Sequence, residues 1–292
     1  MNISLHKIYA TDGLELDAIL FEPRKKTKNI IIHIHGKEGH FIQNHFVTTM
    51  GELYPKNGYS FLTFNNRGHD YLADMIRKSA TGFEWVTKGT AHDRIEEAPS
   101  DIDGVIAFVK KLGYKRIILQ GHSMGPHKIC YYLANNPKHR VNEIVLLSCA
   151  DVLYVLDAHV PDWKRGISIA RKMIDKGMGD ELIDIRLWSN APVSARTYLH
   201  YTQDDSNTWQ FNYSNPKLEF NHFNKVKQPM FAIFSSDDFS IGVESKKALS
   251  MLSERTVSKS FHSAVISDTI HNYASKEKEL ADEILSWLKR FE

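Results

Sequence analysis

The pentapeptide Gly121-His122-Ser123-Met124-Gly125 is the part of the sequence best suited to chemistry. It matches the pattern G-x-S-x-G, in which a serine occupies a sharp turn between a strand and a helix. A strand-like apolar stretch precedes it, and the helical stretch after it starts with a proline, a residue well tolerated in a first helical turn. The free N–H groups of such a helix favour the oxyanion formed in acyl transfer. We therefore expect Ser123 to be a nucleophile rather than a structural turn residue.

A serine becomes nucleophilic only when a base takes its proton and an acid orients that base. With this turn, the acid and then the histidine follow the serine in chain order. Asp237 and Asp238 follow a strand-like stretch at 230–235, and only one of them can reach the imidazole because successive side chains point in different directions. His271, just before the last helical stretch, is predicted to be the base. His262 is its rival, but it lies inside a strand-like run.

The developing oxyanion also requires two N–H donors. One is predicted to be the backbone N–H of Met124, the residue after the nucleophile. The other is predicted to be the backbone N–H of Lys37, in the turn His35-Gly36-Lys37-Glu38-Gly39 that leaves an early apolar strand.

The elements that must position these residues alternate along the chain. Strands are predicted at Ile3–Tyr9, Leu14–Phe21, 29–35, Tyr59–Phe64, Lys115–Gly121, Asn142–Ser148 and Met230–Ser235, and helices at 41–56, Asp101–Lys111, Pro126–Asn135 and Lys276–Arg290. Such alternation is typical of a mostly parallel sheet flanked by helices.

The alternation is interrupted once, by a stretch rich in aromatic residues. We predict that residues 151–228 form a cap insertion over the edge of the sheet where ligands bind, and that 1–150 and 229–292 form the core. Three of the five tryptophans, Trp163, Trp188 and Trp209, lie in this stretch. Its aromatic side chains fit a hydrophobic core, or in part the lining of an acyl pocket.

In these features the chain resembles the α/β-hydrolase superfamily, and in particular its serine esterases and lipase-like members with a cap. The resemblance covers nearly everything outside the cap: the His35-Gly36 turn, the stretch Asn66-Arg67-Gly68-His69, the GHSMG pentapeptide, QPMFAIFSSDD and the late His271. The family's usual Asp in the second of these turns is Asn65 here. The family places the acid nine residues after a proline, which implies Asp238, nine after Pro229. The family's usual glycine three residues before that acid is Ser235 here.

The sequence contains no recognised motif for binding a metal or a nucleotide. His33, His35 and His40 lie close together, but the metallo-hydrolase pattern His-x-His-x-Asp-His would need Asp and His where Lys37 and Glu38 stand. The glycine-rich dinucleotide and P-loop motifs and the zinc motif H-E-x-x-H are absent from the sequence. We expect neither a cofactor nor a metal.

The amino-acid composition limits the classes of protein to which this chain can belong. The 292 residues are 42% hydrophobic and 25% charged, which is ordinary for a globular protein and excludes a disordered or fibrous chain. The formal net charge of +2, without a basic block, does not indicate nucleic-acid binding. The two cysteines, Cys130 and Cys149, lie in apolar stretches and read as buried thiols. Without a signal-like N-terminus or a membrane-length apolar run, we expect a cytoplasmic protein with no membrane insertion.

The sequence thus predicts a carboxylesterase-like serine hydrolase that acts on a small or acyl-chain ester through an acyl-enzyme. Two alternatives stay open. One is a thioesterase or acyltransferase acting on carrier-bound or CoA-bound acyl groups, because GHSMG resembles the turn of such thioesterases. The other is a ligand-binding member of the fold that has lost turnover.

Overall fold

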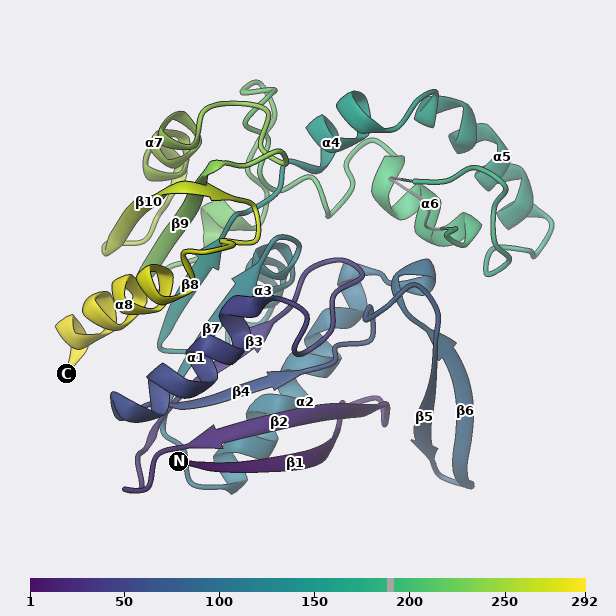
Figure 1. The fold of residues 1–292 in the computed structure, drawn as a ribbon. Coiled ribbons are helices and arrows are strands. Elements are labelled where there is room, and N and C mark those ends of the chain that lie inside the picture. The colour runs from purple at the N-terminus through teal and green to yellow at the C-terminus, as the bar shows by residue number, and fades with distance from the viewer. Residues whose placement is uncertain (188–191) are drawn as a thin grey trace.

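An eight-stranded, mostly parallel sheet forms the centre of the molecule in a computed structural model that describes residues 1–187 and 192–292 (Figure 1). The strand order is β1-β2-β4-β3-β7-β8-β9-β10. β2 pairs antiparallel with β1 and β4, and all other neighbours are parallel. The strands are β1 (Asn2–Tyr9), β2 (Glu15–Glu22), β3 (Asn29–Ile34), β4 (Ser60–Phe64), β7 (Arg116–His122), β8 (Glu143–Leu147), β9 (Met230–Asp237) and β10 (Phe261–Ile270).

Helices cover both faces of this sheet, as the alternating pattern predicts. Along β3, Ile30 and Ile32 join one hydrophobic cluster while Ile31 joins the other, because successive side chains point to opposite faces. Helices α2, α3 and α7 pack on the first face, and α1 and α8 pack on the second. These helices are α1 (His45–Lys56), α2 (Ala98–Lys111), α3 (Gly125–Asn135), α7 (Ser245–Arg255) and α8 (Glu277–Leu288).

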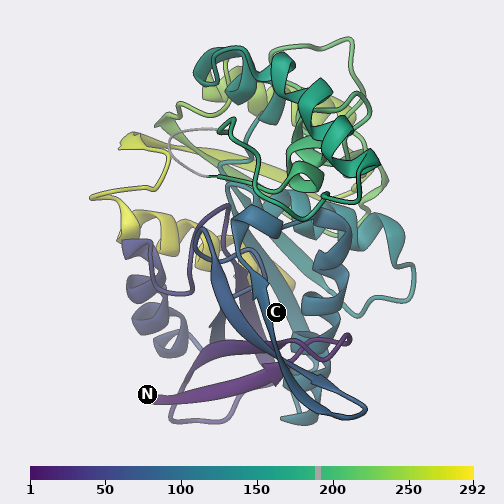
Figure 2. The same cartoon turned by 90° about the vertical axis from the view of Figure 1, so that its right-hand side faces the viewer.

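A two-stranded hairpin, β5 (Ala73–Ser79) with β6 (Gly82–Lys88), stands beside the main sheet (Figures 1 and 2). The sequence pattern predicts no strands here. Most of its residues are exposed or half-buried, so the stretch lacks the apolar runs that mark the strands of the central sheet.

The predicted cap segment 151–228 packs in two different ways. Helices α4 (Val152–His159), α5 (Trp163–Asp175) and α6 (Ala195–Thr202) stand away from the sheet (Figure 1). They form their own hydrophobic cluster, in which Trp163 is buried. Aromatic residues after α6, such as Phe211 and Phe223, instead join the core beneath the sheet. Trp209 packs against the helical cluster, and Trp188 lies outside the described residues. The boundaries of the cap stay a prediction.

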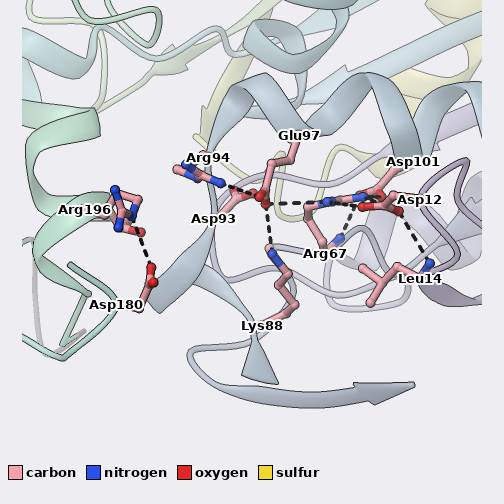
Figure 3. A network of polar contacts seen from close by, with 12 residues as sticks. Asp12, Leu14, Arg67, Lys88, Asp93, Arg94, Glu97, Asp101, Asp180 and Arg196 are labelled. Carbon is pink, nitrogen blue, oxygen red and sulfur yellow. Dashed lines mark hydrogen bonds and ion pairs between the residues drawn. The ribbon is translucent and has the colours of Figure 1, made fainter. Parts of the chain in front are cut away.

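A buried ion network anchors the turn after β4 (Figure 3). The Arg67 guanidinium donates to Asp101 on α2 at 2.6 Å and to Asp12 in the β1–β2 turn at 2.9 Å. Burial lowers the pKa of Arg67, but the two carboxylates outweigh burial and the net shift is upward, so the guanidinium stays charged. The adjoining Asn66 accepts a hydrogen bond from Lys128 of α3 at 2.9 Å. Three elements distant in sequence are thereby held against one turn.

Both cysteines are buried free thiols, as expected from their surroundings in the sequence. In the described ranges, no helix combines the length and the apolar character needed to cross a bilayer.

Candidate active site

Ser123 stands at the junction of β7 and α3 in the left-handed backbone region, with φ of 60°. A non-glycine residue is rare there and marks local strain. The flanking glycines make the turn possible. A Cβ on Gly125 would lie 2.2 Å from the carbonyl oxygen of Ile34, and one on Gly121 would lie 2.6 Å from the carbonyl carbon of Gly125. The G-x-S-x-G spacing therefore follows from backbone contacts that a side chain would block.

Asp238 and His271 meet at the carboxyl edge of the sheet. His271 Nδ1 lies 2.8 Å from Asp238 Oδ1, and the Asp238 side chain is fully buried while that of His271 is 13% exposed. Burial raises the pKa of Asp238, but the hydrogen bond and charge of His271 outweigh burial and hold the pKa well below its usual range. The hydroxyl of Ser240 also donates to Asp238 Oδ1, at 2.7 Å. The carboxylate is thus ionised and fixed beside the imidazole.

The two rival residues lie elsewhere. Asp237 is exposed at the end of β9, where its backbone pairs with Ile270. His262 lies at the start of β10, with its ring 6.4 Å from that of Trp287 in the last helix. Neither residue lines the cavity that contains Ser123.

His122 supports His271 from the side of the nucleophile. Its Nε2 lies 2.9 Å from the backbone carbonyl oxygen of His271, and the two rings are 4.8 Å apart. Burial and the nearby charge of His271 lower the pKa of His122 to about 3, so the ring is neutral at pH 7. A neutral ring with its proton on Nε2 donates to that carbonyl.

The turn after β3 lies directly against Ser123. A Cβ on Gly36 would be 2.8 Å from Ser123 Cβ and 3.3 Å from the backbone nitrogen of Met124, so only glycine fits. His35 holds this turn with both ring nitrogens. Nδ1 donates to the Gly36 carbonyl at 2.8 Å, and Nε2 accepts from the backbone N–H of Asn66 at 3.1 Å. The network around Arg67 therefore extends to the turn that faces the nucleophile.

A cavity of about 460 Å³ opens over Ser123. Four of the predicted site residues line it, namely Lys37, Ser123, Met124 and His271, while Asp238 lies behind His271. Its apolar wall includes Val152 and Val155 of α4. Neither Trp163 nor Trp209 lines it.

The histidines near β3 do not assemble a metal centre. His33 is buried in the core, where its Nδ1 lies 3.2 Å from the side-chain nitrogen of Gln120, and His35 is engaged as described above. Within the described ranges, no group of three or more metal-binding side chains comes together.

The sequence patterns do not predict the roles of His122, His35 and Ser240. His122 occupies a variable position of the G-x-S-x-G pattern, and its contact with His271 spans 149 residues of sequence. Ser240 follows Asp238 by two residues. This nearness to a predicted acid is the local feature of the sequence from which its contact with Asp238 could have been predicted.

The sheet order and the flanking helices are those of the α/β-hydrolase fold. In solved structures the fold matches Est1E from Butyrivibrio proteoclasticus, with ferulic acid bound, at 16% identity over 98% of each chain and a TM-score of 0.65. It also matches a thermostable carboxyl esterase from Bacillus coagulans, at 13% identity over 99% of this chain and 98% of that one, with a TM-score of 0.67. The α/β hydrolase GrgF from Penicillium sp. sh18 matches at 13% identity over 99% of each chain, with a TM-score of 0.69.

Within this fold, the chain belongs to the family described as a protein of unknown function, DUF1749, whose model matches residues 82–289. The matched range includes Ser123, Asp238 and His271. Comparison with curated proteins finds no match.

Proposed function

We propose that this protein is a serine hydrolase that cleaves a carboxylic ester through an acyl-enzyme. The observation that carries the proposal is the 2.8 Å hydrogen bond between Asp238 and His271, at a cavity that His271 and Ser123 line together. An ionised, buried carboxylate fixes the imidazole tautomer and stabilises the imidazolium that forms during attack. Neither effect is needed at a site that only binds a ligand.

In the proposed reaction, Ser123 Oγ attacks the ester carbonyl while His271 Nε2 takes its proton. The backbone N–H groups of Lys37 and Met124 hold the resulting oxyanion. His271 then protonates the leaving alcohol, and the acyl group stays on Ser123. A water, deprotonated by His271, releases the acid and restores the serine.

The structural neighbours support the proposal that the cleaved bond is a carboxylic ester. Besides the two esterases described above, the fold matches a monoacylglycerol lipase from Paleococcus ferrophilus with a TM-score of 0.58 at 15% identity. Ester cleavage also fits a cavity with an apolar wall beside the nucleophile. In this proposal α4 of the predicted cap segment helps to shape the substrate site.

The test is labelling with a fluorophosphonate probe, together with hydrolysis of p-nitrophenyl esters and of acyl-CoA. We expect a covalent adduct on Ser123 and turnover of the oxygen esters. Folded protein that leaves Ser123 unmodified would show a ligand-binding member of the fold. Turnover of acyl-CoA alone would show a thioesterase. Either result contradicts the proposal.

A further inference from the structure

We propose that Thr90 is a positioning residue for the oxyanion turn, the segment 35–39 that carries the donor N–H of Lys37 in the proposed reaction. The inference rests on that proposed function, because the oxyanion forms only when Ser123 attacks an ester. Thr90 is fully buried at the start of the short 3₁₀-helix η1 (Thr90–His92), just after the β5–β6 hairpin. It does not line the cavity over Ser123, so its effect on the reaction must pass through the turn.

The Thr90 hydroxyl joins the oxyanion turn to the turn after β4. Its Oγ1 accepts a hydrogen bond from the backbone N–H of Glu38 at 2.9 Å and donates one to the backbone carbonyl of Gly68 at 3.0 Å. A hydroxyl suits this place because it donates and accepts at the same time. The bond to Glu38 fixes the peptide plane between Lys37 and Glu38, which adjoins the plane that carries the proposed donor.

The backbone of Glu38 depends on such an external contact. Its φ is 58°, in the left-handed region that residues other than glycine rarely occupy. A conformation of this kind persists only where the surrounding structure holds it in place. The hydrogen bond to Thr90 supplies that constraint. Without it, we expect Glu38 to relax and the N–H of Lys37 to move away from the oxyanion.

Other residues hold the two ends of the oxyanion turn. At one end the Asn66 side-chain nitrogen donates to the carbonyl of His35 at 3.3 Å. At the other end the carbonyl of Gly39 accepts from the backbone N–H of Asp70, also at 3.3 Å. Loss of the Thr90 hydroxyl should therefore displace the middle of the turn while its ends stay attached.

The end of the β5–β6 hairpin brings Thr90 to this position. Gly89, the residue before it, has a φ of 92° and donates from its N–H to the backbone carbonyl of Arg67 at 2.9 Å. A Cβ on Gly89 would lie 2.7 Å from the carbonyl oxygen of Tyr71, so the chain comes this close only with glycine. The hairpin is thus connected through Thr90 to the proposed catalytic machinery.

Three variants of Thr90 test the role of its hydroxyl. Thr90→Val keeps the shape of the side chain and removes the hydroxyl. We expect kcat to fall about 10–100-fold, because loss of a whole oxyanion donor costs about 10²–10³ and a displaced donor costs less. KM should stay unchanged, since the donor acts in the transition state and not on the bound ester. Thr90→Ala should lower kcat in the same way, and Thr90→Ser, which keeps the hydroxyl, should recover most of it.

The measurements are kcat and KM on p-nitrophenyl butyrate, with kcat expressed per Ser123 labelled by fluorophosphonate, so that a smaller folded fraction does not enter the value. The second measurement is inhibition by a trifluoromethyl ketone, to which Ser123 adds to form a tetrahedral oxyanion. Its inhibition constant should rise as kcat falls. Thr202→Val is the matched control, because this buried threonine of α6 donates to the Tyr198 carbonyl at 2.7 Å and lies outside the cavity. It should keep the wild-type kcat and inhibition constant.

A wild-type kcat and inhibition constant in Thr90→Val and Thr90→Ala would overturn the inference and leave the esterase proposal standing. A loss in Thr90→Ser as large as that in Thr90→Val would also overturn it, because the hydroxyl would then not be the group responsible. The same holds for a raised KM at unchanged kcat. Wild-type protein that cleaves no ester and leaves Ser123 unlabelled would instead contradict the proposed function itself.

Discussion

The Nε2–H of His122 donates to the backbone carbonyl of His271 across 2.9 Å, which ties the residue before the nucleophile to the proposed base. The His122 ring is enclosed by His271, Phe46 and Tyr273, with the Phe46 ring centroid 5.2 Å away. Its low pKa keeps it uncharged, so it does not repel the imidazolium that forms on His271. His122 is therefore a positioning residue for the base.

Replacing His122 by Phe keeps a ring in this space and removes the donor. We expect kcat to fall about 10–100-fold, because a small displacement of the base costs rates of that order. His122→Gln, which retains an N–H donor, should recover part of the loss. Steady-state kinetics and thermal melts on both variants make the check. If both lose activity equally while melting like wild type, the hydrogen bond is not what positions His271.

Ser123→Ala should abolish ester hydrolysis and leave the protein folded, because it removes only one oxygen from a turn built for a small side chain. Loss of a triad serine costs on the order of 10⁶ in kcat. Circular dichroism checks the fold, and Ser263→Ala, an exposed serine on β10, is the matched control. Activity within about tenfold of wild type in a folded Ser123→Ala would exclude Ser123 as the nucleophile.

Asp238→Asn should lower kcat by roughly 10⁴, because an amide no longer fixes the tautomer of His271 or stabilises its charged form. Asp237→Asn, an exposed neighbour, should have little effect. The comparison uses kcat at one pH near neutrality for the two single variants. The reverse order of effects would show that Asp237 is the orienting acid.

Acid should destabilise the protein starting near pH 6.5. Burial lowers the pKa of His33, His122 and His127 to about 3, so in the folded state they stay neutral where an unfolded histidine, of pKa about 6.5, takes a proton. Because the unfolded chain binds more protons, stability decreases as pH falls from about 6.5 towards 3. Each such histidine contributes about 1.4 kcal/mol per pH unit well below 6.5.

The measurement is the free energy of unfolding by urea between pH 7 and 5. His33→Leu removes one of these groups at a site outside the proposed active site and should make the pH slope shallower by up to one proton. Identical slopes in the variant and wild type would show that His33 does not titrate as described.

Val155 on α4 should influence which acyl chains are accepted, since it lines the cavity. Val155→Ala enlarges the cavity at its apolar wall and should shift chain-length preference by roughly 10–200-fold, because a methylene contact contributes about 1–3 kcal/mol. Trp209→Phe should leave the profile unchanged, since Trp209 lies outside the cavity with its indole N–H on the Tyr201 carbonyl at 2.9 Å. A profile altered by Trp209→Phe and not by Val155→Ala would contradict this assignment. The measurement is the rate of each variant on a series of p-nitrophenyl esters of increasing acyl length, with thermal melts of the variants as controls for folding.

The sequence alone determined the features that depend on neighbouring residues. Apolar stretches alternating with helical ones predicted the parallel sheet and its covering helices, because burial on two faces requires that pattern. The serine turn was recognisable because its glycines are placed two residues either side by local backbone contacts. The order of serine, acid and histidine along the chain then predicted Asp237 or Asp238 as the acid and His271 as the base. The β5–β6 hairpin escaped detection because its mostly exposed residues leave no apolar run.

Tertiary structure decided everything that depends on direction and on distant contacts. Asp238 faces His271 and Asp237 faces solvent, although the two are adjacent, because the turn after β9 aims only one carboxylate inward. The contact of His122 with His271 arises where segments 149 residues apart in sequence meet. Such relations come from the packing of the whole sheet edge. No local pattern of residue types carries them.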